Sequence, residues 1–455
     1  MTQPASSDTP TKSHAPGMLF GLHDRPGPTK ALLAAVAHLL AIVASIATAP
    51  LLIARAIGLD TVTTTYVIAS ALMVSGLATA LQVKRLGPFG SGLLSVQGTS
   101  FAFIGVFAYA AGVLAENGAA AEAIVGTLLG SAAAGALVTV IAGAFIQHLG
   151  RVITQNVTGV AIFLLGISLV LTAYNNLQFT LASASAALPV WLQVLTVLVV
   201  ITVCATRTQP WLRLTAIPVG LVTGLVVAWL SGSFTTAVTL PGGINLLQIL
   251  PFGLGFDFTV FLLLLPIYLV TMTESVGDLT ATNMLSGEPM DGPPYWRRVR
   301  GGVMADGLNS MFAAGLGTFP NTTFSQNNGV IQLTGVASRL VGYLVAGGLL
   351  ILGALPAFSY LFTLIPGGVL HATTGLLFAM IALAGIRILR LQEDQSRAWR
   401  MLIGCSIGAL VLAQTPTLLS AVDIPLPQYA AMLLSFPVAT GAVIAIIWEL
   451  CSGHK

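Results

Sequence analysis

Three acidic residues lie inside long apolar stretches of the chain, where a carboxylate is costly: Glu274, Asp278 and Asp306. Residues 261–272 are almost wholly apolar, and Glu274 and Asp278 follow in the same predicted helix, at the i, i+4 spacing that puts both on one face. A charge at the bilayer centre costs roughly 2.5–3.5 kcal/mol on insertion scales, so such residues usually line the path of a substrate or proton. A buried carboxyl can also hold a proton near neutral pH, as a proton-coupled carrier requires. The alternative for each is a structural hydrogen bond, for example Asp306 capping a neighbouring half-helix.

Amide, aromatic and imidazole side chains supply further candidates. Gln326 and Asn327 each present an acceptor and two donors in one plane, which can pair with a heterocycle edge bearing adjacent N–H and C=O groups. Phe101 and Phe324 could offer their rings to a flat ligand, or could simply pack in the core. His38, in the middle of the first apolar stretch, is either a helix-packing residue or a proton-linked one.

The composition indicates that most of this chain lies in a lipid bilayer. Of 455 residues, 56% are hydrophobic and 7% are charged, with a mean hydropathy of +0.92. In a soluble protein roughly a quarter of the residues are charged, so this chain has too few charged residues to cover the surface of a soluble globular protein. We therefore predict an all-α polytopic membrane protein. Three cysteines without metal-ligand spacing (Cys204, Cys405 and Cys451) are expected to be small core hydrophobes, and neither metal nor cofactor is expected.

Apolar runs of about 20 residues, the length of a membrane-spanning helix, occur about fourteen times. The predicted spans are 31–53, 62–83, 91–114, 121–147, 152–172, 188–205, 212–230, 258–284, 300–316, 321–335, 337–354, 366–387, 398–415 and 430–449. With the N-terminus inside, every lysine and arginine except Arg55 falls in a cytoplasmic loop or tail, which satisfies the positive-inside rule. Both termini are therefore expected in the cytoplasm. The polar residues 1–30 are expected to form a disordered cytoplasmic tail.

Two interrupted segments stand at matching places in the two halves of the chain. Residues 90–101 and 320–329 are too polar and glycine-rich for continuous lipid-facing helices, and each is the third span of a seven-span half. An odd number of spans per half predicts an inverted repeat, in which substrate binds near the midplane at broken spans. We expect each break to be an extended piece followed by a half-helix, with Ser, Thr or Asn at the N-cap. Two ordinary kinked helices are the alternative.

Several of these segments together resemble the nucleobase–ascorbate transporter family. Residues 326–335 read Gln-Asn-Asn-Gly-Val-Ile-Gln-Leu-Thr-Gly and match every constrained position of the family signature. Residues 273–282 are similar to the family's eighth span, 91–101 to its third, 305–307 to its ninth and 37–38 to its first. The resemblance covers nearly everything from about residue 30 to residue 450.

The resemblance implies a fold, a partner and a location. Family members are proton or sodium symporters of nucleobases or ascorbate, with fourteen spans in a core and a gate domain, and they are usually dimeric. For this chain a proton gradient is the expected driving force, and no cofactor is expected. The implied core domain comprises residues 31–147 and 258–355, and the implied gate domain comprises residues 152–230 and 366–449. The partners would be a small purine, the lipid bilayer and a second copy of the chain, with no nucleic acid. The location would be a bacterial-type cytoplasmic (inner) membrane.

The resemblance also implies roles for the polar candidates. Glu274 would hydrogen-bond the base and couple to the proton, and Gln326 would hold the opposite edge of the ring. Asp306 and Asn327 would support the site, and His38 would tune it from the first span.

The residues at the two breaks would complete that implied site. Phe101, Ser100, Phe324 and Ser325 would contact the substrate, partly through backbone N–H groups, and Asp278 would support the site from the eighth span.

Departures within the family narrow the implied substrate. Similar uracil carriers have Glu in place of Gln326 and His in place of Asp278, and ascorbate carriers have Pro at the first signature position. This chain therefore looks like the xanthine and uric acid branch. Ser100 stands where similar bacterial xanthine permeases carry Asn, whereas fungal urate–xanthine carriers have Ser, so uric acid is a second candidate.

Three alternatives stay open. The chain could carry uracil or another nucleobase on the same fold. It could be an anion transporter or channel, since half-helix dipoles suit an anion, although such proteins lack the Gln-Asn-x-Gly signature. It could be an intramembrane hydrolase, since Gly277-Asp278 resembles a motif of membrane aspartyl proteases, although no second aspartate has the matching context.

Overall fold

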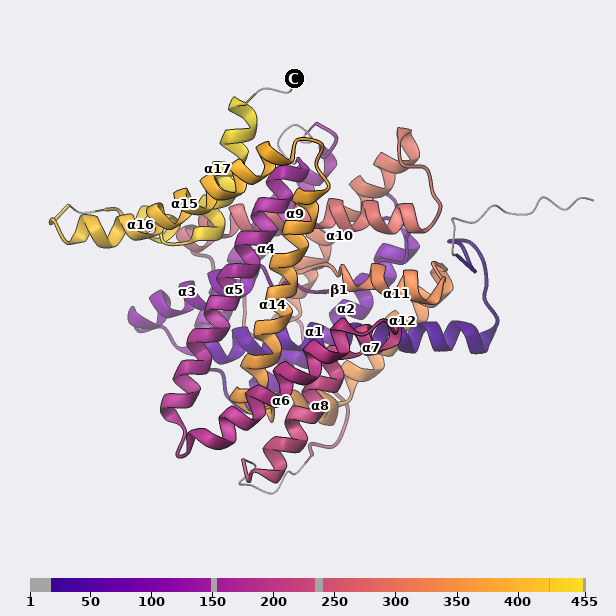
Figure 1. The fold of residues 1–455 in the computed structure, drawn as a ribbon, viewed down its shortest axis with the longest axis horizontal. Coiled ribbons are helices and arrows are strands. Elements are labelled where there is room, and N and C mark those ends of the chain that lie inside the picture. The colour runs from indigo at the N-terminus through magenta and orange to yellow at the C-terminus, as the bar shows by residue number, and fades with distance from the viewer. Residues whose placement is uncertain (1–17, 149–153, 234–239, 425, 453–455) are drawn as a thin grey trace, which may run out of the picture.

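The computed structural model describes residues 18–148, 154–233, 240–424 and 426–452 (Figure 1). The first half of the chain forms α1 (Pro28–Ile57), α2 (Thr61–Lys84), β1 (Gln97–Thr99), α3 (Phe103–Glu116), α4 (Ala121–Ala144), α5 (Gln155–Ser183), α6 (Ala187–Thr206), α7 (Pro210–Leu214) and α8 (Ala216–Leu230). The second half forms α9 (Phe258–Leu285), α10 (Gly292–Gly315), β2 (Asn321–Thr323), α11 (Gln326–Thr334), α12 (Arg339–Ala354), α13 (Pro356–Thr363), α14 (Gly367–Arg390), α15 (Gln395–Ser420), α16 (Gln428–Leu434) and α17 (Pro437–Cys451).

The all-α prediction is confirmed, and each of the fourteen predicted spans contains at least one helix. Among the described residues, eight single helices are long and apolar enough to cross a membrane, or nine when α12 and α13, bent by 75° at their junction, count as one span. Three shorter apolar helices (α3, α8 and α17) accompany them. The total of fourteen spans stays a prediction.

Local chemistry sets the ends of the first two helices. Pro28 stands in the first turn of α1, where its missing N–H removes no helical bond, and Gly58 ends that helix at φ 81°, a conformation that glycine adopts without strain. Asp60 then caps α2, because its carboxylate accepts hydrogen bonds from the N–H groups of Val62 and Thr63, both at 3.2 Å.

The two interrupted segments meet as a short antiparallel sheet inside the helical body. Gly98 of β1 lies opposite Thr322 of β2, and the pairing continues through the Ser100 N–H to the carbonyl of Pro320 at 2.9 Å. Glycine at position 98 permits this close packing, because a Cβ there would lie 2.7 Å from Cγ1 of Ile46 and 2.9 Å from Cζ of Phe324, so those side chains would have to shift. Each strand is followed by a short helix, as predicted for both breaks.

The predicted side-chain caps of these short helices are wrong. Ala102 and Ser325 occupy the N-cap positions of α3 and α11, and neither makes a side-chain cap hydrogen bond. The hydroxyl of Ser325 instead donates to a carboxylate of α9, which forms a stronger, charge-assisted hydrogen bond than a neutral cap.

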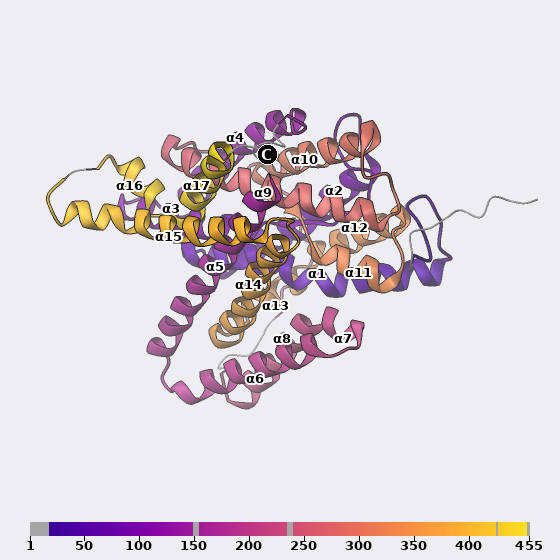
Figure 2. The ribbon, with the colours of Figure 1, turned by 45° about the horizontal axis from the view of Figure 1, so that its top comes forward.

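Two sets of helices pack mainly among themselves. In one set α5 lies alongside α14, with α6 packed against α8, and in the other α2 packs against α12 and α4 against α10 (Figures 1 and 2). The helix α9 contacts α4, α10 and β2, so its polar face lies beside the second break. The pair α15–α16 extends away from the body in both views.

The prediction that residues 1–30 form a disordered tail is wrong for residues 18–30, which the structure describes as ordered. Residues 1–17 lie outside the described residues, as do the charged positions Lys12, Arg151 and Lys455 of the orientation argument. Residues 18–27 pack on the chain that follows α11: Ala337 N–H donates to the carbonyl of Phe20 at 2.9 Å, and Leu22 is buried. Backbone hydrogen bonds and buried apolar side chains thus order a segment whose composition looked solvated.

Candidate functional site

The carboxylate of Asp278 joins α9 to the second break. It accepts hydrogen bonds from the hydroxyl groups of Thr323 in β2, at 3.1 Å, and of Ser325, at 3.0 Å. One turn further along, the hydroxyl of Thr282 donates to the side-chain oxygen of Asn328 at 2.6 Å. Polar side chains on both elements therefore fix the second break against one face of α9.

Glu274 lies one helical turn, about 5.4 Å along the axis, before Asp278 on that same face. Its side chain is half-buried and makes no hydrogen bond with any described residue. It lies close enough to Asp278 and Asp306 for the like charges to interact. Within the described structure, Glu274 is therefore a carboxyl group near the break that no internal donor satisfies.

Asp306 is fully engaged inside the protein. Its carboxylate accepts a hydrogen bond from Nε2 of Gln82 at 2.7 Å and another, on its other oxygen, from the hydroxyl of Ser275. Nε2 of Gln82 also donates to the carbonyl of Gly302 at 2.9 Å, and its Oε1 accepts from the N–H of Ser91 at 2.9 Å. Asp306 thus connects α2, α9 and α10, and among the described residues it caps no half-helix.

Ser275 extends this network to the sheet. Its hydroxyl lies 3.1 Å from that of Thr322, so the residue next to Glu274 is bonded to both α10 and β2. Asn327 plays a similar part at the other strand, because its Nδ2 donates to the carbonyl of Leu94, just before β1, at 2.6 Å.

Gln326 begins α11 directly after Ser325. Its side chain is half-buried and, within the described regions of the chain, has no hydrogen-bond partner. Gln326 therefore follows the residue that is bonded to Asp278, and Glu274 lies one helical turn before Asp278. Among the described residues, neither polar side chain has an internal partner.

The two predicted phenylalanines lie in contact. The rings of Phe101 and Phe324 have centroids 6.0 Å apart, and Phe101 also packs edge-on against Phe378 of α14, at 5.6 Å. Ser100 is buried, and its hydroxyl accepts a hydrogen bond from the N–H of Ala102 at 3.3 Å. The aromatic cluster of Phe101, Phe324 and Phe378 therefore connects both breaks with α14, which packs against α5.

His38 is the candidate that the structure joins least to the others. It is fully buried in α1, and neither ring nitrogen has a hydrogen-bond partner among the residues described. α1 packs against α3, α11 and β1, so His38 lies on a helix that contacts both breaks.

Several residues of this arrangement were not predicted as site residues, among them Gln82, Ser275 and Phe378 and the threonines Thr282, Thr322 and Thr323. The sequence carried a signal for Gln82, an amide within an otherwise apolar and weakly polar helix, where an unpaired polar group would be costly. Ser275 and Phe378 had no such signal, because serine and phenylalanine are ordinary in membrane helices.

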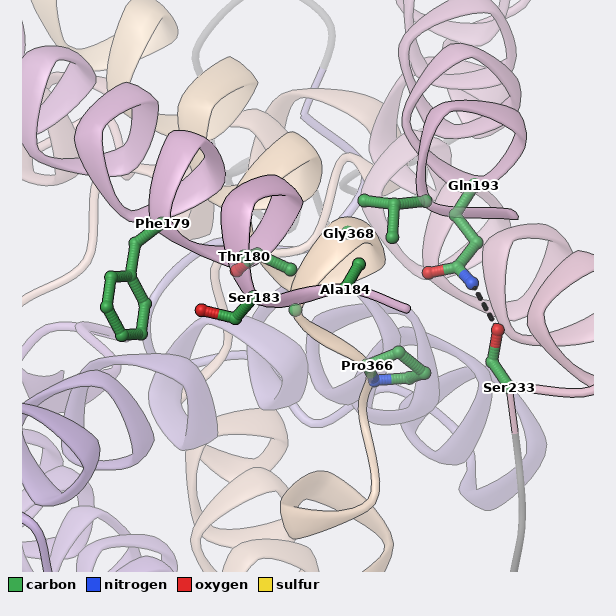
Figure 3. Close-up of a pocket in the computed structure, with 10 residues that line it drawn as sticks. Phe179, Thr180, Ser183, Ala184, Gln193, Ser233, Pro366 and Gly368 are labelled. Carbon is green, nitrogen blue, oxygen red and sulfur yellow. Dashed lines mark hydrogen bonds between the residues drawn. The ribbon is translucent and has the colours of Figure 1, made fainter. Parts of the chain in front are cut away.

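A separate cavity of about 360 Å³ lies away from these residues, at the ends of α5, α6 and α14 (Figure 3). Gln193 lines it and donates from Nε2 to the hydroxyl of Ser233 at 2.8 Å, with Phe179 and Pro366 on other sides (Figure 3). None of the predicted site residues lines this cavity. Its described lining has no carboxylate, so the polar cluster around α9 and the two breaks is the stronger candidate site.

Comparison with known proteins identifies the family. A profile of the permease family matches residues 29–416. The xanthine permease XanQ of Escherichia coli (strain K12) is 37% identical over 443 residues, which cover 95% of this chain and 93% of that protein. This chain belongs to the nucleobase–ascorbate transporter family. The uric acid-xanthine permease of Emericella nidulans is also similar, with 30% identity over 403 residues, covering 80% of this chain and 70% of that protein. These relatives are named as permeases and not as enzymes.

The fold is also found in solved structures of more distant transporters. The transmembrane domain of the cyanobacterial bicarbonate transporter BicA superposes with a TM-score of 0.57 and 14% identity, covering 94% of this chain and 99% of that one. The predicted inverted-repeat fold of a multi-pass membrane protein is therefore confirmed, since that domain shares it over almost the whole chain.

Proposed function

We propose that this chain is a proton-coupled symporter that imports a purine base, xanthine or uric acid or both. The observation that carries the proposal is the pair of unpartnered polar groups, Glu274 and Gln326, on adjoining elements beside the aromatic cluster of the described structure. The names of the relatives support the substrate class, since XanQ is a xanthine permease and the Emericella nidulans protein a uric acid-xanthine permease.

The proposed binding mode uses one group at each edge of the ring. An amide can donate and accept in one plane, so Gln326 would pair with an edge of the purine that has adjacent N–H and C=O groups. Glu274 would accept or donate at the opposite edge. Phe101 and Phe324 would pack against the ring, for which aromatic side chains favour offset or edge-on contacts.

The charge around the site supports coupling to protons. Glu274, Asp278 and Asp306 are three carboxyl groups in a low-dielectric environment, where like charges repel strongly. Uric acid is an anion at neutral pH, so binding beside three carboxylates would be unfavourable unless a proton bound with it. Glu274 is the proposed proton carrier, because Asp278 and Asp306 already accept hydrogen bonds from hydroxyl and amide donors.

The proposed motion moves a core domain (31–147 and 258–355) against a gate domain (152–230 and 366–449). The candidate site lies on the core side, and Phe378 of α14 contacts it from the gate side. We further propose a homodimer in a bacterial-type inner membrane with both termini in the cytoplasm.

Uptake of labelled xanthine, uric acid and uracil into whole cells tests this function. Cells expressing the protein should accumulate xanthine or uric acid well above control cells, and a proton uncoupler should abolish that accumulation. Preferential uptake of uracil would contradict the substrate, and accumulation that survives the uncoupler would contradict the coupling.

A further inference from the structure

Four arginines gather at the end of the molecule that the charge pattern assigns to the cytoplasm. Arg85 follows α2, Arg297 and Arg298 lie in the first turns of α10, and Arg339 begins α12. These are separate elements, brought together by the turn of residues 85–92: Gly90 N–H donates to the carbonyl of Gly301 at 2.8 Å. The basic cluster defined by these four arginines therefore depends on the fold and not on sequence proximity.

Contacts around Gly92 show how closely two of the arginines approach. Nε of Arg339 donates to the carbonyl of Gly92 at 2.7 Å. A Cβ built on Gly92 would lie 2.7 Å from Nη2 of Arg339 and 4.0 Å from Cβ of Arg85. One guanidinium group is thus held over the turn that carries the other.

The charges of the cluster are only partly balanced. Glu288 pairs with Arg298, with Oε2 2.6 Å from Nη2. Asp24, on the neighbouring N-terminal segment, accepts a hydrogen bond from the N–H of Gly21 at 2.8 Å. Among these described side chains, four positive and two negative groups leave an excess of two positive charges. Arg85, Arg298 and Arg339 are partly buried, and Arg297 is exposed.

The electrostatics of individual members agree with this excess. Burial lowers the pKa of Arg85, and the charges of Arg297 and Arg339 lower it further. Burial also lowers the pKa of Arg298; Glu288 acts in the opposite direction, and Arg339 and Arg85 add to the lowering. A bound anion would relieve this repulsion.

Arg298 supplies an independent indication of a missing partner. Its Nη1 is buried and, among the described residues, makes no hydrogen bond, although Nη2 of the same group is paired. A buried donor without a partner is costly, and guanidinium groups bind phosphate oxygens with particular favour. The positive-inside rule explains why arginines lie on this side, but it requires neither convergence nor an unpaired buried donor.

We propose that Arg85, Arg297, Arg298 and Arg339 form a binding site for a phosphate-bearing anion. Its source is either the head group of an anionic phospholipid or a soluble phosphate. The site would tie together the turn that leads into β1, the start of α10 and the start of α12, which follows α11. An anion bound there would stiffen the frame that holds both broken spans.

The test compares two double variants of the full chain reconstituted in vesicles. Arg85→Gln with Arg297→Gln removes two members whose side chains make no hydrogen bond within the described structure, so folding should be preserved. Arg207→Gln with Arg213→Gln is the matched control, because it removes two exposed arginines assigned to the same side. Thermal unfolding is measured in phosphatidylcholine alone, with phosphatidylglycerol added, and with inorganic phosphate added. All three proteins should have similar Tm values in phosphatidylcholine.

The expected result is a rise in Tm of the parent and the control variant with one of the two anions, and a much smaller rise in the cluster variant. Each basic residue near a membrane surface contributes about fivefold to anionic lipid affinity, so the cluster variant should need about 25 times more phosphatidylglycerol for the same shift. A rise in Tm with phosphatidylglycerol but not with inorganic phosphate identifies a lipid site. A rise of equal size with inorganic phosphate identifies a site for a soluble anion. The proposal would be overturned if neither anion raised the Tm of the parent, or if both double variants lost the same part of that rise.

Discussion

The hydroxyl of Ser325 donates to the carboxylate of Asp278 at 3.0 Å, and this bond places the start of α11 beside the acidic face of α9. Because Gln326 follows Ser325 and Glu274 lies one turn before Asp278, the same bond sets the positions of both proposed ligands of the purine. Within the described chain the two groups that would bind substrate are unpartnered, whereas the groups that hold them are bonded to the protein. Rigid support around a few open polar groups is the arrangement expected of a preorganised site.

Replacing Glu274 with glutamine should uncouple transport from the proton gradient. The variant keeps the shape of the side chain but cannot take up or release a proton. We expect purine accumulation in cells to fall to the level reached without a proton gradient, while exchange of purine across vesicles persists. The measurement is uptake of labelled xanthine and uric acid with and without an uncoupler. Glu116→Gln, at the exposed end of α3, is the control and should behave as the parent. Uncoupler-sensitive accumulation by Glu274→Gln would disprove the assignment.

Replacing Gln326 with alanine should weaken purine binding about tenfold. The variant loses a paired donor and acceptor, and each neutral hydrogen bond contributes about 0.5–1.5 kcal/mol. No internal network is disturbed, because the Gln326 side chain makes no hydrogen bond within the described chain. Titration of purified protein with xanthine measures the change in Kd. Gln178→Ala, an exposed amide on α5, should leave the Kd unchanged, and an unchanged Kd in Gln326→Ala would exclude the amide from the site.

Replacing Gln82 with leucine should destabilise the protein. The buried carboxylate of Asp306, the carbonyl of Gly302 and the N–H of Ser91 would each lose a partner. Leaving one buried polar group unsatisfied costs about 1–3 kcal/mol, so we expect a fall in Tm of several degrees or more. Gln155→Leu, at an exposed amide pair with Gln392, should change the Tm little. A Gln82→Leu variant as stable as the parent would mean that this network carries little stability.

The sequence predicted the membrane class, the helices and both breaks, because apolar length and interruption by glycine and polar residues are local properties. It also predicted Glu274 and Gln326 as candidates, since a carboxylate or an amide in an apolar segment is conspicuous. It did not predict that β1 and β2 pair with each other, that Gln82 holds Asp306, or that Ser325 bonds to Asp278 in place of capping α11. These contacts join residues distant in the chain, and their partners are fixed only when the helices pack.

Arg55, the one basic residue that the charge pattern places outside, should control the rate of transport. From the end of α1 its Nη2 donates to the carbonyl of Ile365 at 2.8 Å and to that of Thr363 at 3.2 Å. These carbonyls lie at the end of α13, which packs on α2, and in the connection that leads to α14, which packs on α5. Arg55 thus holds the segment that joins the proposed core domain to the proposed gate domain.

Arg55→Gln would weaken that connection without touching the candidate site. We expect the maximal rate of purine uptake to change severalfold, while the Kd of purified protein for xanthine stays within about twofold of the parent, since rate and affinity separate when a mutation acts on a conformational step. Arg400→Gln, which removes an exposed arginine on α15, is the control for loss of charge. If Arg55→Gln altered the Kd and left the maximal rate unchanged, Arg55 would act on binding, and the connection between α13 and α14 would not be a hinge.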